Sequence, residues 1–408
     1  MGISLALFFL YAYFMVQGIL PLASIDSFIH ASSIKEMHDS GLFGETRWNM
    51  PGYLLHPPIL LPIFWVLSLI PADFRLIYVL FQTLAVIISY AVHRKLGKGQ
   101  LFFNFFMNPV VFYTLMVFSR INEFFALNFL LIAIYLKKYK KTSFVLFLAS
   151  ILAQPTVLLV YSLILLETNK NLIKRVIAAY TVASPYLFYL FISQSNLAMA
   201  RARYFFTASP ALVLGCFAFI FGFLIYQKKQ FSSQLAWYSL LTLSVLNFLV
   251  AFSDFFSHLI PIVSQIFPIT IVLAFIFLDS AKFDRLKKLM FVMGFAWVFI
   301  ISAAANIQNN SDITNLVSGY NGTFCVERIE GLRTHIFYKT YLSTVLNKTI
   351  ADNPVFEFTK GDLWALMDLK SCAEIPKECD YVVTDNYERF GDCLIRQSGD
   401  LFLLGHRG

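Results

Sequence analysis

The chain has 408 residues, of which 58% are hydrophobic and only 14% are charged, and its mean hydropathy is +0.67. Soluble globular domains contain about 45–50% apolar and about 25% charged residues, so this composition excludes an ordinary soluble protein and predicts a polytopic membrane protein. The net charge of +8 hides a split, because residues 1–305 carry 22 Lys and Arg against 10 Asp and Glu, whereas residues 306–408 carry 10 against 14. The basic residues are scattered in short loops, which favours cytoplasmic membrane loops over a nucleic-acid-binding face.

Nine stretches are long and apolar enough to be expected as membrane helices, which need about 20 mostly apolar residues. The first has neither a basic start nor a small-residue cleavage site, so we expect it to be an uncleaved span. The nine stretches are Ser4–Leu22, Phe74–Val92, Leu101–Phe118, Phe124–Leu136, Val176–Ser193, Pro210–Tyr226, Gln234–Phe252, His258–Leu278 and Leu289–Ala305.

Two further apolar stretches, Leu54–Ile70 and Ser143–Leu166, contain proline, which interrupts a helix. If both of them cross the membrane, the basic loops 93–99 and 137–141 fall outside, against the preference of Lys and Arg for the cytoplasm. If neither crosses, every basic loop is cytoplasmic, and the second stretch is a hairpin broken at Gln154-Pro155. Broken backbone at membrane depth then implies a cavity that covers it. Two ordinary kinked spans remain the alternative, and both versions place the N-terminus in the cytoplasm and the C-terminus outside.

The first outward loop, residues 24–53, contains "DSFIHASSIKEMHDSG", which has helical spacing. Asp26 and His30 are four residues apart and share one face of such a helix. An ionisable group at the membrane is a candidate functional residue, whereas a helix N-cap is the simpler reading of Asp26. The apolar positions of the helix are predicted to lie on lipid: Ile25, Phe28, Ile29 and Met37.

Further candidate residues lie in the other outward segments. His56, in "HPPILLP", is either a ligand, a proton carrier or an interfacial residue. The loop "SRINE" carries Arg120, Asn122 and Glu123, which form either an ion pair across a tight turn or a second polar cluster that faces Asp26. The remaining candidates are arginines in "ARARY", whose guanidinium forks suit a lipid phosphate or headgroups in general: Arg201 and Arg203.

The tail, residues 306–408, is predicted to be a small extracytoplasmic α/β domain. We expect a helix at 333–346, a strand in "YVVTD" and two strands in "LIRQSGDLFLLG" that turn at Ser398-Gly399-Asp400. Four of the five cysteines lie here and favour two disulfides in an oxidising compartment, with three pairings open. These cysteines are Cys325, Cys372, Cys379 and Cys393, and three N-x-S/T sequons begin at Asn309, Asn321 and Asn347.

Residues 1–200 resemble the polyprenyl-phosphate-sugar-dependent glycosyltransferases of the C-type superfamily (GT-C). An outward carboxylate follows the first span, the long first loop closes in "YLLHPPI", and a basic inner loop comes next. From residue 106 onward, an Asn-Pro pair, a polar and acidic outer loop, a span that ends in basic residues and a small-residue stretch broken before a proline continue the layout. The resemblance implies a mostly α membrane protein with about 9–11 membrane helices, broken or re-entrant ones included, and a GT-C-like catalytic domain at residues 1–305.

The resemblance also implies roles for the outward residues. Asp26 and Glu123 are the predicted catalytic residues. Asp26 would be the general base or would position the acceptor, and Asn122 and Glu123 would assist in binding acceptor, donor or metal. Arg201 or Arg203 would hold the lipid phosphate. His30, His56 and Arg120 complete the predicted substrate-binding set. Ser27 follows Asp26 where many relatives have a second acid. No cofactor is certain, and a divalent metal, Mg²⁺ or Mn²⁺, is left open.

The implied reaction transfers a sugar from a polyprenyl (dolichyl) phosphate to an external glycan, lipid or protein, in the cell membrane or the endoplasmic reticulum membrane. The acceptor is a weak nucleophile, so a carboxylate at its proton is useful, and positive charge at the anomeric carbon is stabilised by a nearby anion. The partners are therefore the lipid-linked sugar, its acceptor and membrane lipids, with no nucleic acid. A transporter or flippase, and a non-catalytic scaffold, are the alternatives.

Overall fold

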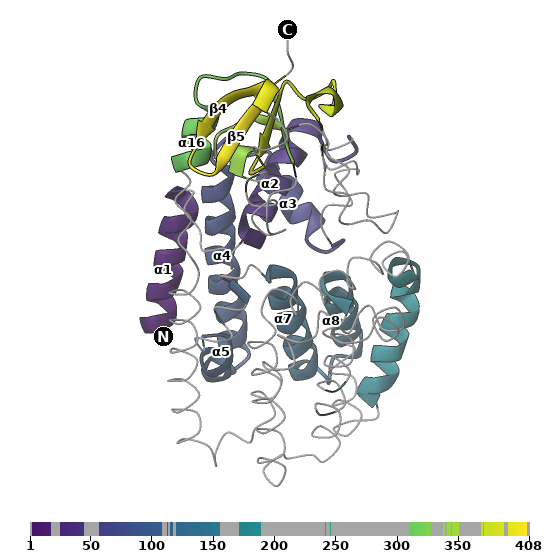
Figure 1. Ribbon diagram of the computed structural model, residues 1–408. Helices are drawn as coiled ribbons and strands as arrows, with labels where there is room; N and C mark the ends of the chain where they lie inside the picture. The colour runs from purple at the N-terminus through teal and green to yellow at the C-terminus, as the bar shows by residue number, and fades with distance from the viewer. Residues whose placement is uncertain are drawn as a thin grey trace.

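The computed structural model is mostly helical and carries one small sheet near the carboxyl terminus (Figure 1). The expected spans beyond residue 200 lie outside the described residues, apart from Leu241 and Val245. Among described residues the side chains of 3, 4, 7, 25, 26, 29, 101, 104 and 105 are not included. The described residues are 2–17, 25–44, 57–107, 112, 115, 116, 120–155, 171–188, 241, 245, 311–327, 338, 341–343, 345–350, 369, 371–386 and 391–405.

Helix α4 is the centre of the amino-terminal part, because α1, α2, α5 and α7 all pack against it. Helix α2 also contacts α3, and α7 contacts α8. Within the described part of the chain, α4 is the one helix that is long and apolar enough to cross a membrane; Phe8–Gln17 and Ile121–Tyr135 are shorter apolar helices. The helices are α1 (Gly2–Gln17), α2 (Ile25–Ser40), α3 (Leu61–Ser68), α4 (Phe74–Lys95), α5 (Gly99–Phe106), α7 (Ile121–Tyr135), α8 (Lys140–Ala153) and an unlabelled helix at residues 171–188.

Helix α4 has local signals at both of its ends. The Asp73 carboxylate caps its amino end by accepting a hydrogen bond from the Arg75 backbone amide at 2.9 Å. Three basic residues, 93–95, occupy its last turn, where positive charge interacts favourably with the helix dipole. The chain then turns through Gly97, whose φ of 70° favours glycine.

The distribution of polar and apolar side chains on α4 is the reverse of that on a helix of a soluble protein. Its buried face carries the polar residues Gln82, Ser89 and His93. Soluble helices bury their apolar stripe and expose their polar one, whereas polar groups of a membrane helix face the bundle interior. The opposite face is apolar and exposed along a helical stripe, formed by Leu76, Leu80, Leu84, Ile87 and Ile88.

Helices α7 and α8 form an antiparallel hairpin with a close interface. The Ser150 hydroxyl donates to the Ala126 carbonyl oxygen at 2.8 Å. The small residues Ala126, Ala133 and Ala153 are fully buried, which lets two helix backbones approach closely.

Neither proline-containing stretch forms a long helix in the described residues. Helix α3 has eight residues, or about 12 Å of helix, against a hydrocarbon core of about 30 Å. Helix α8 ends at Ala153, and Gln154 has extended backbone, with φ −159° and ψ 100°. An Arg175 guanidinium nitrogen donates to the Lys137 carbonyl oxygen at 2.8 Å, so the start of the helix at residues 171–188 lies against the turn between α7 and α8.

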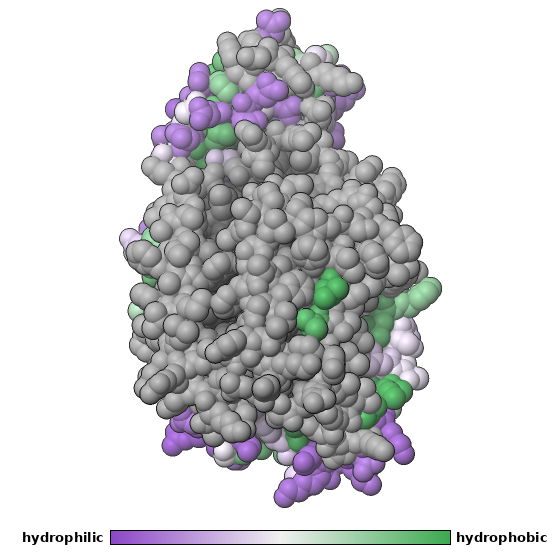
Figure 2. Space-filling model, turned by 60° about the horizontal axis from the view of Figure 1, so that its bottom comes forward, coloured by the Kyte–Doolittle hydropathy of each residue, from purple (hydrophilic) through white to green (hydrophobic). Residues whose placement is uncertain are grey.

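The two ends of the molecule differ in what they carry. The sheet lies at one end, beyond α2 and the start of α4, while α5 and the α7–α8 turn lie at the other (Figure 1). Described hydrophilic side chains gather at both ends, and most of the described hydrophobic ones in this view lie between them (Figure 2).

The tail contains a five-stranded sheet of order β2-β1-β3-β5-β4. Strands β1, β2 and β3 pair in parallel, whereas β5 pairs antiparallel to both β3 and β4. The β4–β5 hairpin turns at Gly399, whose φ is 58°, as the Ser-Gly-Asp sequence predicts. Of the helix expected at 333–346, residues 338, 341–343, 345 and 346 are described; 338 and 341–343 are helical, whereas 345 and 346 form a turn. The elements are α16 (Ser311–Val317), β1 (Thr323–Val326), β2 (Thr349–Ile350), β3 (Tyr381–Thr384), β4 (Leu394–Ser398) and β5 (Leu401–Gly405).

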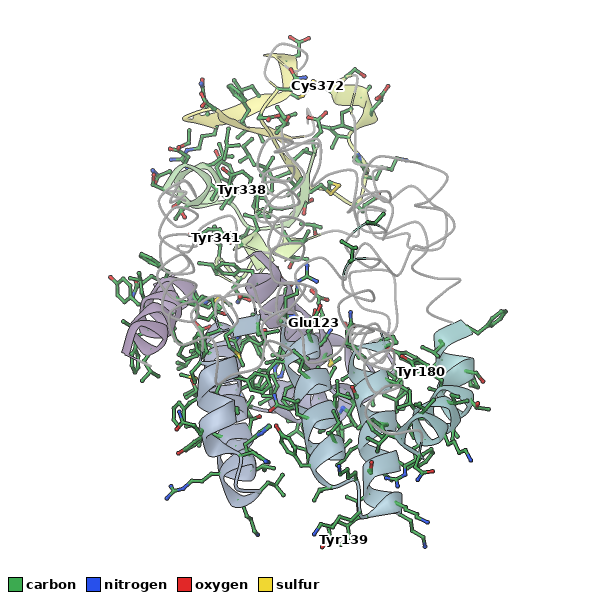
Figure 3. All side chains as sticks on the ribbon, turned by 90° about the horizontal axis from the view of Figure 1, so that it is seen from below. Glu123, Tyr139, Tyr180, Tyr338, Tyr341 and Cys372 are labelled. Atoms are coloured by element: carbon green, nitrogen blue, oxygen red, sulfur yellow. A yellow bond between two sulfur atoms is a disulfide. The ribbon has the colours of Figure 1, made fainter. Side chains whose placement is uncertain are left out.

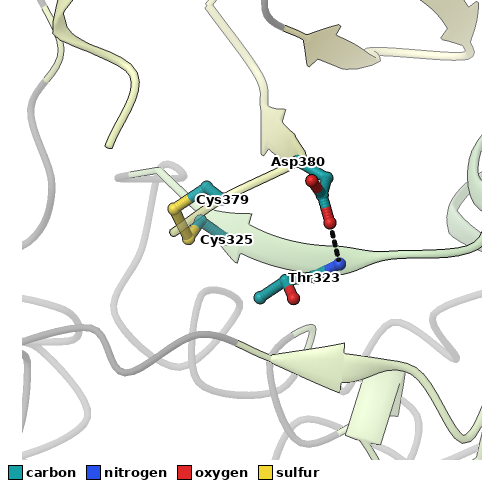
Figure 4. The surroundings of a disulfide bond; sticks show 4 residues. All are labelled: Thr323, Cys325, Cys379 and Asp380. Carbon is teal, nitrogen blue, oxygen red and sulfur yellow. Dashed lines mark hydrogen bonds between the residues drawn. A yellow bond between two sulfur atoms is a disulfide. The ribbon is translucent and has the colours of Figure 1, made fainter. Parts of the chain in front are cut away.

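Two disulfides join segments of the tail, Cys325–Cys379 and Cys372–Cys393. They agree with the expectation of two bridges and choose one of its three pairings. The first joins β1 to the residue that lies two positions before β3, next to the Asp380 carboxylate that accepts from the Thr323 amide at 2.8 Å (Figure 4). Cys325, Cys379 and Cys393 are buried in a separate small apolar cluster, so the tail combines a minor core with covalent links.

Replacing Asp73 by Ala is expected to destabilise the protein by about 1 kcal/mol, because α4 loses its cap. Partial burial raises the pKa of the Asp73 carboxyl, but its hydrogen bonds to Arg75 and the Arg75 charge outweigh this effect, so the net pKa is lowered. A lowered folded-state pKa contributes stability above the unfolded-state pKa of about 4, and this contribution is lost as the pH falls through the folded-state value. Thermal unfolding of wild type and Asp73→Asn between pH 6 and 2 checks this, since Asn keeps the cap and removes the charge. Parallel stability curves would contradict it.

Candidate functional site

The amino end of α2 carries the first predicted site residue. Asp26 lies in the first turn of α2, and its side chain is outside the described residues. The predicted position of this helix on lipid is wrong for Phe28 and Met37, which are 0% and 2% exposed inside the protein. An amphipathic pattern states that one face is apolar, but it does not state whether lipid or protein covers that face. Ile25 and Ile29 are outside the described side chains.

A buried hydrogen-bond network fixes the residue that follows Asp26. The Tyr11 hydroxyl of α1 is hydrogen bonded to Ser27 Oγ at 2.7 Å and to Gln82 Oε1 of α4 at 3.0 Å. The Gln82 amide nitrogen donates to the Met116 carbonyl oxygen at 2.9 Å. Four separate segments of the chain are therefore joined directly beside Asp26, and a satisfied buried network of this kind makes its surroundings rigid.

His30 lies one helical turn after Asp26 and packs among aromatic rings. Its ring stacks on Tyr78 with centroids 5.4 Å apart, and it also contacts Phe64 at 5.9 Å. Both aromatic side chains are fully buried. Phe64 of α3 and Tyr78 of α4 therefore fix the orientation of the His30 ring. These contacts hold the second turn of α2 in place.

The second predicted cluster lies at the start of α7. The Arg120 guanidinium donates to Glu123 Oε1 at 3.1 Å, and the Glu123 residue is only 4% exposed. The ion pair across a tight turn is therefore formed. Asn122 lies between the pair, and its buried Oδ1 has no hydrogen-bond partner among the described residues. Glu123 is at the end of α7 that points toward the tail, opposite Tyr139 (Figure 3).

Two predicted clusters, one at Asp26 and His30 and the other at Arg120, Asn122 and Glu123, are anchored to the same short stretch of α4, residues 78–82. Ser27 reaches Gln82 through Tyr11, and His30 stacks on Tyr78. On the α7 side, Phe125 stacks on Phe81 with ring centroids 5.9 Å apart. This stretch covers about 6 Å of helix axis, so the first turns of α2 and α7 are brought to the same end of the molecule.

Three predicted site residues, His56, Arg201 and Arg203, lie outside the described residues. No group of three or more His, Cys, Asp or Glu side chains in the described part converges as metal ligands would. The Glu123 carboxylate faces a guanidinium, which repels a cation beside it.

No family model matches the chain, and no curated protein or solved structure matches it significantly. The resemblance to the GT-C enzymes accordingly rests on the sequence features given above.

The sequence interpretation missed the residues that support the site. Tyr11 and Gln82 are 71 positions apart, and no periodicity connects them. One signal was present, because Gln82 is a polar residue inside an otherwise apolar span, and such residues usually face a partner within the bundle.

Replacing Gln82 by Leu is expected to destabilise the protein by about 1–3 kcal/mol, because the buried Met116 carbonyl and Tyr11 hydroxyl each lose a partner. Thermal unfolding in detergent micelles measures the change. Thr83→Val, on the neighbouring position, removes only a hydroxyl that bonds the preceding turn of its own helix and is the matched control. Equal unfolding temperatures for the two variants would contradict the role of the network.

Proposed function

We propose that the chain is an integral membrane glycosyltransferase that moves a sugar from a polyprenyl phosphate to a hydroxyl acceptor on the non-cytosolic side. The main observation behind the proposal is that both polar clusters are anchored to residues 78–82 of α4, at the end of the molecule that bears the tail. The sugar of a lipid-linked donor lies at the membrane surface, so the acceptor must reach the donor at that surface.

The surface of the described helices supports a membrane position. Helix α4 buries its polar residues and exposes a stripe of Leu and Ile, which suits lipid chains and not water. The basic turns at 93–99 and 137–141, together with Arg175, lie at the end away from the tail. That arrangement agrees with a cytoplasmic position for these loops, and the disulfides suit an oxidising compartment for the tail.

In the proposed reaction Asp26 accepts the proton of the acceptor hydroxyl while that oxygen attacks the anomeric carbon. The bond between this carbon and the phosphate oxygen breaks, and the polyprenyl phosphate leaves with the electron pair. The paired Glu123 holds Arg120 at the start of α7. In the proposed complex the buried Asn122 Oδ1, which has no hydrogen-bond partner among the described residues, accepts a hydrogen bond from a sugar or acceptor hydroxyl when the substrate binds against it. Glu123 then acts by positioning its neighbours, because its charge is balanced by the guanidinium.

Purified full-length protein in lipid nanodiscs, incubated with a panel of polyprenyl-phosphate sugars and simple glycoside acceptors, tests the proposal. Release of polyprenyl phosphate together with a lengthened acceptor is the expected result. A transporter or flippase would instead move a fluorescent lipid-linked sugar between leaflets without releasing phosphate. Absence of release with every donor in the panel, from protein that remains folded, would contradict the enzyme assignment.

A further inference from the structure

We propose that Asn321 and Asn347 form a paired N-glycosylation site at the amino ends of strands β1 and β2. Both asparagines begin N-x-T sequons, and both are exposed in the residues just before a strand. The third sequon of the tail, at Asn309, lies outside the described residues. The inference depends on a non-cytosolic tail and not on the transferase activity.

The two sequons run side by side in the sheet. Strands β1 and β2 are parallel, and the sequon threonines Thr323 and Thr349 are register partners. Neighbouring strands are about 4.8 Å apart. Because each asparagine lies two positions before its threonine, both asparagines lie at the same end of the sheet, where β1 and β2 begin. Glycans on them would therefore lie next to each other.

Local contacts hold both turns in place, and among the described residues neither asparagine side chain takes part in them. The Lys348 ammonium of the second sequon donates to the Tyr320 carbonyl oxygen, which directly precedes the first sequon. In the first sequon, a Cβ on Gly322 would lie 2.6 Å from an Asp380 carboxylate oxygen, so glycine is needed there. In the second, Asn347 has φ 52°, a region that asparagine adopts more readily than most residues.

The modification forms one bond and breaks one. The asparagine amide nitrogen attacks the anomeric carbon of a lipid-linked oligosaccharide, an N-glycosidic bond forms, and the bond from that carbon to phosphate breaks. The lipid phosphate leaves with the electron pair, and a base of the modifying oligosaccharyltransferase takes the amide proton. The threonine hydroxyl two residues later is part of the acceptor signal, and it is present in both sequons.

Expression of the full chain in a eukaryotic secretory host tests the site. An Asn309→Gln background limits the tail to the two sequons, and intact mass is measured before and after treatment with a peptide N-glycosidase. The expected result is a loss of two glycans from this background, one from Asn321→Asp or Asn347→Asp, and none from the double variant. Aspartate removes the acceptor nitrogen and tolerates the positive φ of Asn347.

Thr349→Ser and Thr349→Val form a matched pair, since both alter the same exposed edge position and only Ser keeps the sequon. The Ser variant is expected to keep its glycan and the Val variant to lose it. A background protein with one glycan or none would overturn the paired site. Labelling of a cysteine placed at Asp400 with a membrane-impermeant thiol reagent separates this failure from a cytosolic tail.

Discussion

On the proposed mechanism, replacing Asp26 by Asn is expected to lower the rate of sugar transfer by about 10²–10⁴-fold, the range in which a general base contributes. The amide has nearly the same shape as the carboxylate, but it cannot accept the acceptor proton. The expected change is in kcat, because the residues that surround this position, Ser27 and His30, keep their contacts with Tyr11 and Tyr78. Release of polyprenyl phosphate under saturating donor measures kcat, and the donor Kd is measured separately with a non-transferable analogue.

Asp39→Asn is the matched control for this variant. Asp39 lies on the same helix, pairs with Lys35 at 2.9 Å and is exposed. Its partner Lys35 is buried, and neither residue has a role in the proposed reaction, so this variant should transfer sugar at the wild-type rate. Retention of more than a tenth of the wild-type kcat by Asp26→Asn would remove Asp26 from the role of base, as would an equal loss in the control.

Removal of the Cys325–Cys379 bridge by a double Ala substitution is expected to destabilise the tail by about 4 kcal/mol. The bridge closes a loop of 54 residues, and on the chain-entropy account the stabilisation grows with the logarithm of that length. The Cys372–Cys393 bridge spans 21 residues and should contribute about 3 kcal/mol on the same account. Both cysteines of the first bridge are 1% exposed, so its loss also leaves a small cavity in the apolar cluster around Val382 and Leu404.

Limited proteolysis of full-length protein in nanodiscs measures this effect, with mass spectrometry locating the cuts. The variant that lacks the Cys325–Cys379 bridge should be cut within the tail faster than the variant that lacks the Cys372–Cys393 bridge. Both variants should be cut faster than wild type. The fifth cysteine, Cys216, lies outside the tail; its replacement by Ala serves as the control and should behave as wild type. Equal cutting rates in all four proteins would show that the tail does not depend on its bridges.

Several features of the tail could be predicted because local chemistry determines them. The alternating and apolar residues of β3, β4 and β5 favour strands, and Gly399 suits the turn between the last two. The cysteine pairing could not be predicted, since β1 and β3 become neighbours only through a parallel crossover. Sequence spacing carries no information about such a neighbour.

Of the candidate residues, the Arg120–Glu123 ion pair could be predicted from its short segment. The packing of α1, α2 and α7 on residues 78–82 of α4 could not be predicted from sequence spacing. The prediction that Phe28 lies on lipid failed for the same reason, because whether lipid or neighbouring helices cover an apolar face depends on tertiary packing.

The inverted faces of α4 determine which sequence changes the helix can accept. On the proposed membrane position, lipid acyl chains cover the outer stripe and adapt to any hydrocarbon shape, so Leu80 or Leu84 should exchange freely with Ile, Val or Met. A Lys at the centre of this stripe would cost about 2.5–3.5 kcal/mol. On the inner face few substitutions should be tolerated, because Gln82 is 0% exposed and both the oxygen and the nitrogen of its side-chain amide are hydrogen bonded. The exposed apolar positions of this helix should therefore vary quickly between related sequences, whereas the apolar core positions of a water-soluble protein vary slowly. The buried polar positions of the helix should vary slowly.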